Sequence, residues 1–429
     1  MGQRAAGAPD AQVTITGGTG GNETPVYDKR EGREMSEHLK RRIGLGLLTA
    51  YGVGVMVGAG IYVLVGAVAA EAGVWAPLSF VIAGLIAAPT ALSYAEFSTR
   101  LPEAAGEAVF VEKGLGHAWL GMLVGLAIVA AGTVSAAAVL RGGTGYLLSV
   151  VDLPFAATAI VMGLVLVGVA IAGVLESLTV AALFTAVEVL GLALVVWAGA
   201  GAEPTADYAA PAAIVWTGVA SAAVLAFFAF IGFEDIVNMA EEVRDPLRTL
   251  PRAILMSLVI TSLLYALVSW AAVRAVPLER LGASEQPLAL VWSSARGGNA
   301  GFLSLIAVAA AMNGILAQIV MASRVMFGVG RRHPSLAVFH HAHPRFGTPV
   351  LATALIGVAV IAMAVLLPVA DLAEATSAIL LSVFVLVNAA LIAMKRAEPE
   401  AAFRVPMAVP VVGLLAAIGA LAVSFGVGS

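Results

Sequence analysis

The chain has 429 residues, of which 60% are hydrophobic and only 12% are charged, and its formal net charge is −4. Soluble domains carry about a quarter charged residues, so this composition predicts a membrane protein. The sequence contains no cysteine, which excludes disulfides, thiolate metal sites and cysteine nucleophiles.

Long apolar segments recur along the whole chain. Residues 1–36 precede them, are polar, and are expected to form a disordered tail. A membrane-crossing helix needs about 20 apolar residues. This length predicts spans at about 43–70, 75–99, 118–149, 154–174, 179–200, 212–239, 253–275, 299–324, 349–368, 374–394 and 406–427. Three connections, 101–117, 277–298 and 331–349, are expected to hold short interfacial helices. The sequence therefore predicts an all-α polytopic membrane protein with about eleven transmembrane helices.

Lysine and arginine gather on one side of these spans. With the N-terminus inside, the outer connections keep only Arg274, Arg280 and Arg296. The inner connections hold Lys40, Arg41, Arg42, Arg100, Lys113, Arg244, Arg248, Arg252, Arg324, Arg331, Arg332, Arg345, Lys395, Arg396 and Arg404. Such an asymmetry marks the cytoplasmic side. We therefore expect a cytoplasmic N-terminus and, with eleven spans, the last residue of this sequence outside.

Glycines crowd the middle of the first span, at Gly52, Gly54, Gly58 and Gly60. Each costs a helix about 1 kcal/mol relative to alanine. A broken helix also frees backbone groups that lipid cannot satisfy, so a break persists only where it lines a cavity. This pattern predicts an interruption at Gly58-Ala59-Gly60 that forms a binding site. The alternative is a helix-packing face built on the GxxxG of Gly54 and Gly58.

The sixth span has a similar interruption. Gly232 lies at its middle, and Glu234 and Asp235 follow directly. A charge at this depth is costly unless it faces a cavity or a partner. Two interruptions five spans apart indicate a transporter built from inverted repeats. We expect these repeats at 41–200 and 211–394, with 404–429 as an additional span.

The two breaks are suited to the two ends of a free amino acid. The half-helix after Gly60 presents N–H groups and a positive dipole end, which suit a carboxylate. The half-helix before Gly232 ends in C=O groups, which suit an ammonium. The expected substrate-binding residues are Val57, Gly58, Ala59, Gly60, Ile61, Phe230, Ile231, Gly232, Phe233 and Glu234. The phenylalanines near Gly232 either form an apolar wall or, for Phe227 and Phe228, face lipid.

Several segments resemble a known family. Residues 58–62, which read GAGIY, resemble the Gly-Ser-Gly-Ile-Phe break of the amino acid–polyamine–organocation (APC) superfamily of permeases. Residues 227–254, 322–330 and 343–349 resemble its sixth-helix signature, its eighth helix and the loop that follows. The resemblance runs from about Arg41 to Pro410. It implies a LeuT-like 5+5 inverted repeat with broken helices 1 and 6, alternating access, and transport of amino acids or related amines.

Several polar residues inside the spans are candidates for coupling or ion pairing. Glu188 matches a position where proton-coupled relatives often have lysine, so it is expected either to be protonated in half of the cycle or to pair with a cation. Arg141 is one such cation, and a static Arg141–Glu188 pair is the structural alternative. Glu234 is expected to face the substrate amine, to carry the coupling proton, or to hydrogen-bond the broken backbone. Asn313, together with Gln318 of the same span, belongs either to a cation site or to ordinary interhelical hydrogen bonds.

The leading hypothesis is a secondary active transporter that moves amino acids across the plasma membrane by alternating access, driven by protons or by exchange. The alternative is a polyamine or cationic amino acid carrier, and a third hypothesis is a non-transporting membrane sensor with the same fold. We expect no enzymatic activity, no cofactor, no bound metal and no nucleic-acid partner. The expected partners are the substrate, H⁺ as the coupling ion and the lipid bilayer, and the oligomeric state is open.

Overall fold

The computed structural model of the protein describes residues 43–58, 60–101, 106–173 and 178–425. The chain divides into Met1–Leu39 and Lys40–Ser429, and all of the described residues belong to the second unit. The expected tail, 1–36, and Ala59 of the first break therefore lie outside the described residues.

Each predicted span has a helical counterpart. In chain order these are α1 (Leu45–Val57) with α2 (Gly60–Ala72), α3 (Ala76–Arg100), α5 (Ala118–Leu148), α6 (Phe155–Ala172), α7 (Leu178–Ala200), α9 (Trp216–Phe227) with the 3-10 segments η2 (Phe228–Phe230) and η3 (Glu234–Glu242), α10 (Pro246–Ala275), α13 (Gly301–Arg332), α14 (Val350–Leu366), α15 (Val369–Ala397) and α16 (Ala408–Ser424). Within the described ranges, eight helical stretches are long and apolar enough to cross a membrane alone, and α1, α14 and α16 are shorter apolar helices.

Short helices lie in the three connections where they were expected: α4 (Gly106–Leu115), α11 (Leu278–Gly282) with α12 (Pro287–Arg296), and η4 (Pro334–Phe339). Two more, η1 (Gly73–Trp75) and α8 (Ala206–Ala209), lie in connections where none was expected. The described residues form no sheet and only one isolated bridge, between Ile43 and Val243. The predicted all-α polytopic fold with interrupted first and sixth spans is confirmed.

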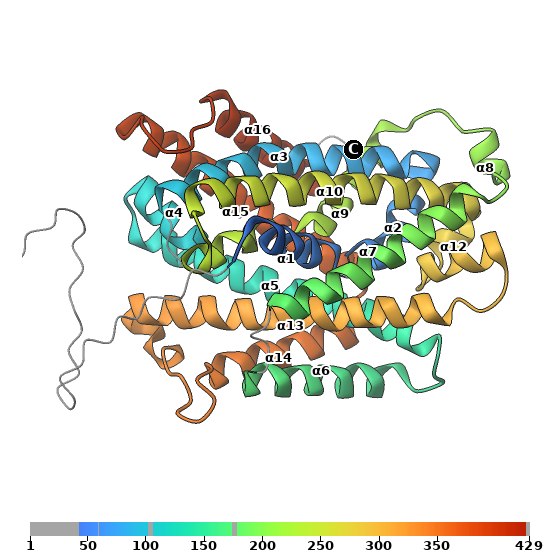
Figure 1. The fold of residues 1–429 in the computed structure, drawn as a ribbon, viewed down its shortest axis with the longest axis horizontal. Helices are drawn as coiled ribbons and strands as arrows, with labels where there is room; N and C mark the ends of the chain where they lie inside the picture. The colour runs from blue at the N-terminus through green and yellow to red at the C-terminus, as the bar shows by residue number, and fades with distance from the viewer. Residues whose placement is uncertain (1–42, 59, 102–105, 174–177, 426–429) are drawn as a thin grey trace, which may run out of the picture. The chain divides into compact units, whose positions relative to one another are not determined.

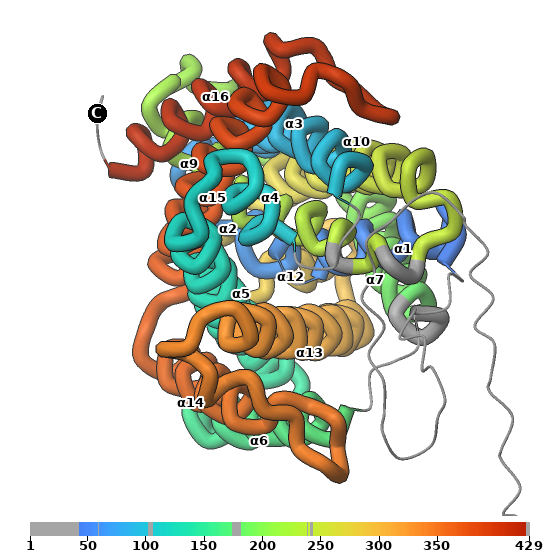
Figure 2. Tube along the Cα trace, turned by 90° about the vertical axis from the view of Figure 1, so that its left-hand side faces the viewer, coloured from blue at the N-terminus to red at the C-terminus, as the bar shows by residue number. Residues whose placement is uncertain are grey.

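Most spanning helices fall into two groups (Figures 1 and 2). Helices α1, α2, α3, α9 and α10 pack together in one group, and α5, α6, α13 and α14 form the other. Helix α7 contacts α1, α10 and α13, and α15 contacts α5, α3 and α9, so each touches both groups. The first two spans of both predicted halves share one group, and the third and fourth share the other. This arrangement is that of a 5+5 repeat, whereas the boundaries 41–200, 211–394 and 404–429 stay predictions.

The two broken helices run in opposite directions. Ile43, just before α1, forms its bridge with Val243, just after η3. The backbone N–H of Arg244 also donates to the carbonyl of Ile43 at 2.8 Å. The beginning of the first broken helix thus lies beside the end of the second, as an inverted repeat requires.

A buried ion cluster ties α3 to the connection between α15 and α16. The fully buried carboxylate of Glu96 accepts hydrogen bonds from Lys395 Nζ at 2.6 Å, Arg100 Nη2 at 2.7 Å and the backbone N–H of Val405 at 2.9 Å. Arg100 also donates to the backbone carbonyl of Glu398 at 2.9 Å. A buried charge is tolerated when it is paired and fully hydrogen-bonded in this way.

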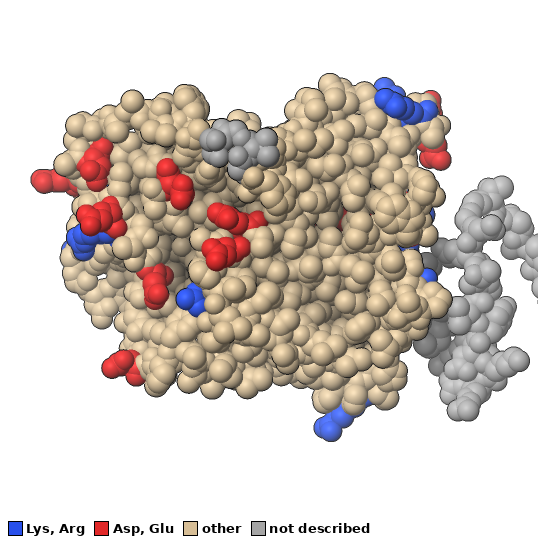
Figure 3. All heavy atoms as spheres, turned by 180° about the vertical axis from the view of Figure 1, so that it is seen from behind, with Lys and Arg blue, Asp and Glu red and all other residues tan. Residues whose placement is uncertain are grey.

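The two ends of the bundle differ in charge. Acidic side chains gather where α8, α11 and α12 lie, at the left of Figure 3, and this end is termed the acidic end. It carries Glu71, Asp152, Glu203, Asp207, Glu279, Glu285 and Asp371. The opposite end, where α3 ends, α5 begins and α13 ends, is termed the basic end. It carries Arg100, Lys113, Arg324, Arg331, Arg332, Arg345, Lys395 and Arg396.

Candidate functional site

The first break separates α1 from α2. Helix α1 ends at Val57, and the N–H of Gly58 still donates to the Gly54 carbonyl at 2.9 Å. Gly58 then leaves the helical region, with φ 18° and ψ −118°, and α2 starts at Gly60. A Cβ on Gly58 would lie 3.1 Å from the Val55 carbonyl oxygen, so a side chain there would crowd the turn.

The second break follows α9. The chain tightens into η2, Ile231 is extended with φ −61° and ψ 132°, and Gly232 has φ +123°. Only glycine adopts such a positive φ without strain, which explains its presence at this point. A Cβ on Gly232 would also lie 2.7 Å from Cγ1 of Val55. The two breaks therefore meet directly.

Two further contacts bind the breaks together. A Cβ on Gly60 would lie 2.9 Å from the Cα of Ala229, so α2 approaches η2 closely only because residue 60 lacks a side chain. From α10, the hydroxyl of Tyr265 lies 2.7 Å from the Met56 carbonyl oxygen and 2.8 Å from the Ala229 carbonyl oxygen. Its proton is shared between one carbonyl from each break. Tyr265 is fully buried and thus fixes both interruptions to the same scaffold helix.

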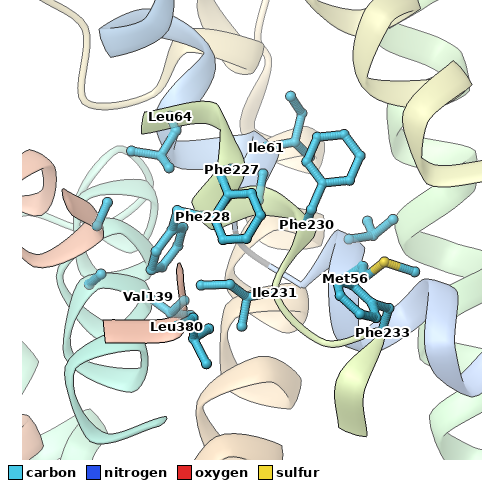
Figure 4. Packing of buried hydrophobic residues seen from close by; sticks show 14 of the residues in the cluster. Met56, Ile61, Leu64, Val139, Phe227, Phe228, Phe230, Ile231, Phe233 and Leu380 are labelled. Atoms are coloured by element: carbon cyan, nitrogen blue, oxygen red, sulfur yellow. The ribbon is translucent and has the colours of Figure 1, made fainter. Parts of the chain in front are cut away.

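A small cavity lies between the breaks, α5 and α13, and Figure 4 shows part of its wall. It is lined by Val55, Met56, Gly58, Gly60, Ser135, Val139, Phe228, Ile231, Gly314 and Gln318. It has room for about one water molecule, so an amino acid would enter only if the walls move apart. The wall is apolar except for backbone groups and the side chains of Ser135 and Gln318.

The family model for amino acid permeases matches residues 43–428. The chain belongs to this family. It is therefore a membrane transporter of the APC superfamily and not an enzyme, and amino acids are its substrate class.

Relatives of this permease carry different names. It is 30% identical over 403 residues to the branched-chain amino acid permease BcaP of Bacillus subtilis, a match that covers 88% of this chain and 86% of that protein. It is 32% identical to the vacuolar cationic amino acid transporter 4 of Arabidopsis thaliana, over 75% of this chain and 58% of that protein. It is also 28% identical to a methylthioribose transporter of Bacillus subtilis, over 79% of this chain and 78% of that protein.

The expected substrate-binding residues of the permease divide into two sets. Gly58, Gly60 and Ile231 line the cavity, and Gly232 closes the turn beside it. Val57, Ile61, Phe230 and Phe233 are buried but are not among the lining residues. Phe230 packs against Tyr265, and Phe233 packs against Tyr94 and Phe384. Substrate contact by any of them stays a prediction.

The phenylalanines before the second break face inward. Phe227 is 1% exposed and Phe228 is 4% exposed, so neither faces lipid. Phe227 packs edge-on against Phe384 of α15, and Phe228 lines the cavity. Phe228 therefore has the expected role of an apolar wall, whereas Phe227 is buried but does not line the cavity.

Glu234 makes the backbone hydrogen bond that was one of its expected roles. Its Oε2 accepts from the N–H of Gly232 at 3.0 Å, so the side chain turns back and caps the break that it follows. It does not line the cavity between the breaks. It lines a second cavity, beside Asp235 and Gln318.

Glu188 and Arg141 do not form an ion pair. Arg141 Nη1 donates to the carbonyl of Ala364 at 2.9 Å, at the end of α14, and its guanidinium lies 4.9 Å from the centroid of the Phe155 ring. The interpretation of a static Arg141–Glu188 pair is therefore wrong for this conformation. Arg141 instead satisfies a helix C-terminus.

Glu188 is buried against α13. Its side chain is 1% exposed, and neither carboxylate oxygen has a well-formed hydrogen bond to any residue that the structure describes. The side chain that approaches it is Asn313 of α13. The Glu188 backbone carbonyl accepts from the hydroxyl of Tyr62, a residue of α2. Glu188 and Asn313 are thus brought together next to the first broken helix.

The sequence left several cavity residues unidentified. Ser135 had a usable signal, since it is a polar residue inside an apolar span. Val55, Met56, Val139 and Gly314 had none, because nothing in a uniformly apolar helix marks the side that faces a cavity.

Proposed function

We propose that this permease binds an α-amino acid between its two helix breaks and carries it across the membrane by alternating access. The contact between the breaks supports this proposal, since it brings the start of α2 and the end of η2 to one cavity. The first N–H groups of α2 lack intrahelical partners and suit a carboxylate. The carbonyls at the end of α9 and η2 suit an ammonium.

Contacts that close the cavity from both ends of the bundle support alternating access; each set of contacts is termed a cover. At the acidic end, Gln286, just before α12, donates to the Gly145 carbonyl at 3.1 Å, and the hydroxyl of Tyr146 donates to the Tyr62 carbonyl at 2.7 Å. At the basic end, Ile43 is bridged to Val243. A substrate larger than the cavity must separate one cover at a time, which is the gating expected of such a carrier.

We further propose H⁺ as the coupling ion, with Glu188 as the residue that holds it. A buried carboxyl group with no cationic partner among the described residues is suited to exchange a proton during the cycle. The proposed location is the plasma membrane with the basic end, and so the N-terminus, in the cytoplasm.

The test is uptake of radiolabelled L-leucine into proteoliposomes, with matched glycine variants. Gly60→Ala would place a methyl group 2.9 Å from the Cα of Ala229 and push the breaks apart, whereas Gly46→Ala, at the start of α1, meets nothing within 4 Å. We expect Gly60→Ala to lose at least tenfold in substrate affinity and Gly46→Ala to keep the wild-type affinity. Normal uptake by Gly60→Ala would contradict a site between the breaks.

Competition by analogues tests recognition of both ends of the substrate. 4-Methyl-2-oxopentanoate lacks the ammonium of leucine, and isopentylamine lacks its carboxylate. Neither should compete for leucine uptake if both backbone sites contribute. Competition by the amine alone would instead favour a polyamine or cationic carrier. The similarity to Arabidopsis cationic amino acid transporters supports that second candidate, so lysine, arginine and putrescine belong in the same panel.

A further inference from the structure

A second cavity adjoins the first on the side of the basic end. Ile231 and Gln318 belong to the walls of both. Along α5 the wall shifts from Ser135 to Gly132, and along α13 it shifts from Gly314 to Met321. Since α5 begins and α13 ends at the basic end, the second cavity lies about one to two helical turns closer to that end. Its full wall is Ile128, Ala131, Gly132, Ile231, Glu234, Asp235, Gln318, Met321 and Leu380.

Three oxygen-bearing side chains face this cavity with too few donors between them. Among the described residues, Glu234 receives the Gly232 N–H, and Asp235 receives a long bond of 3.5 Å from Gln318 Nε2. Because the amide nitrogen of Gln318 faces a carboxylate, its Oε1 must point the other way. That oxygen has no hydrogen-bond partner among the described residues, although Gln318 is only 6% exposed. It would lie 3.1 Å from a Cβ on Gly132, which is part of the wall.

The acidic groups of this cavity have no paired cation among the residues that the structure describes. None of the ion pairs between described residues includes Glu234 or Asp235. Among the described residues, the other ionisable groups close enough to interact with them are Glu107 of α4, Tyr94 of α3 and Tyr51 of α1, and none of the three brings a positive charge. Arg324 of α13 is close enough to interact with Tyr51, but it lies six residues beyond Gln318 and is exposed. Acidic groups held in apolar surroundings bind a cation or a proton.

We propose that this second cavity is a cation-binding pocket in which Asp235, Glu234 and the Gln318 carbonyl oxygen, once a half-turn of its amide brings that oxygen toward Asp235, hold a primary ammonium group or an alkali-metal ion. A set of carboxylate and amide oxygens with no nitrogen or sulfur ligand suits such hard cations. Two sources can supply this chemistry. One is the side chain of a bound amino acid, with its α-groups at the breaks and its ammonium group reaching past Ile231. The other is a free ion that enters from the basic end.

The first source, the side chain of a bound amino acid, rests on the proposed function. Comparing the binding of L-lysine with that of L-norleucine distinguishes this source from a free ion. Their straight side chains differ chiefly in the terminal ammonium. Binding to the purified full chain is measured by calorimetry in sodium, potassium or choline chloride of equal ionic strength. A substrate-derived cation predicts that lysine binds at least tenfold more tightly than norleucine in every salt. A free-ion site predicts that norleucine binds at least tenfold more tightly in sodium or potassium than in choline.

Variants of the pocket test the assignment directly. Asp235→Asn should abolish whichever preference the wild type shows, and Asp371→Asn, an exposed acid on α15, should leave it unchanged. Met321→Lys introduces a tethered ammonium group into the wall. It should bind norleucine independently of the salt and discriminate against lysine at least tenfold. If Asp235→Asn does not fold, Met321→Lys carries the test alone.

The proposal is overturned if the wild type binds both amino acids equally in all three salts. If neither amino acid binds, the proposed function fails, and the pocket is then tested by thermal unfolding. A higher unfolding temperature in sodium or potassium than in choline, lost in Asp235→Asn, would support the pocket. Equal temperatures in the three salts would overturn it.

Discussion

Replacing Tyr265 by phenylalanine tests how the two breaks are held together. The change removes one buried oxygen and keeps the ring, whose centroid lies 5.2 Å from that of Phe230 and 5.8 Å from that of Phe80. The carbonyls of Met56 and Ala229 then lose the donor that they share at 2.7 and 2.8 Å. Leaving buried acceptors without a donor costs about 1–3 kcal/mol.

The assay is thermal unfolding of the purified permease together with its affinity for the transported amino acid. We expect Tyr265→Phe to unfold a few degrees below the wild type and to bind substrate several-fold more weakly. Tyr208→Phe is the matched control, since the Tyr208 hydroxyl accepts from Trp270 at the acidic end, away from the breaks. That variant should keep its substrate affinity. A Tyr265→Phe protein with wild-type stability and affinity would refute the view that this hydroxyl fixes the breaks.

Two further predictions concern carboxyl groups. Glu188→Gln should abolish substrate accumulation driven by a proton gradient while preserving substrate exchange in proteoliposomes. The reason is that the amide keeps the shape of the side chain but cannot release a proton. Gradient-driven accumulation by this variant would rule out Glu188 as the coupling residue. Glu107 is 3% exposed in α4, and burial raises its pKa from 4.5 to about 7. The folded state therefore holds a proton that the unfolded state releases between these values, so Glu107 lowers stability as pH rises, by at most about 3 kcal/mol above pH 7. Glu107→Gln should unfold at a higher temperature than the wild type at pH 8 and at a similar one at pH 4.5, and an unchanged difference between the two pH values would contradict this assignment.

The interruptions were predictable because glycine and buried charge are conspicuous in an apolar span. Gly58, Gly60 and Gly232 mark the breaks in the sequence, and the structure places all three at the junction of α1, α2 and η2. The all-α fold followed from the length of the apolar segments in the same way.

The partners of the buried polar groups were not predictable. Sequence order cannot show that Glu234 turns back to the Gly232 N–H while its neighbour Asp235 meets Gln318, since either side chain could do either. Arg141 and Glu188 have opposite charges, and their charges alone suggested a pair. Packing decided otherwise, because the end of α14 supplies Arg141 with carbonyl acceptors. Such outcomes depend on which helices become neighbours.

The ion cluster at Glu96 bears on how the protein is made. Glu96 and Arg100 leave the ribosome early, whereas Lys395 follows Glu96 by 299 positions and Val405 by 309. Until those residues emerge, a carboxylate that ends fully buried lacks its lysine and its backbone donor. The basic end of α3 therefore cannot reach its final packing until α15 has inserted and the chain has turned toward α16. The contact of the second span with α15 and the start of α16 therefore forms late in the synthesis of this permease.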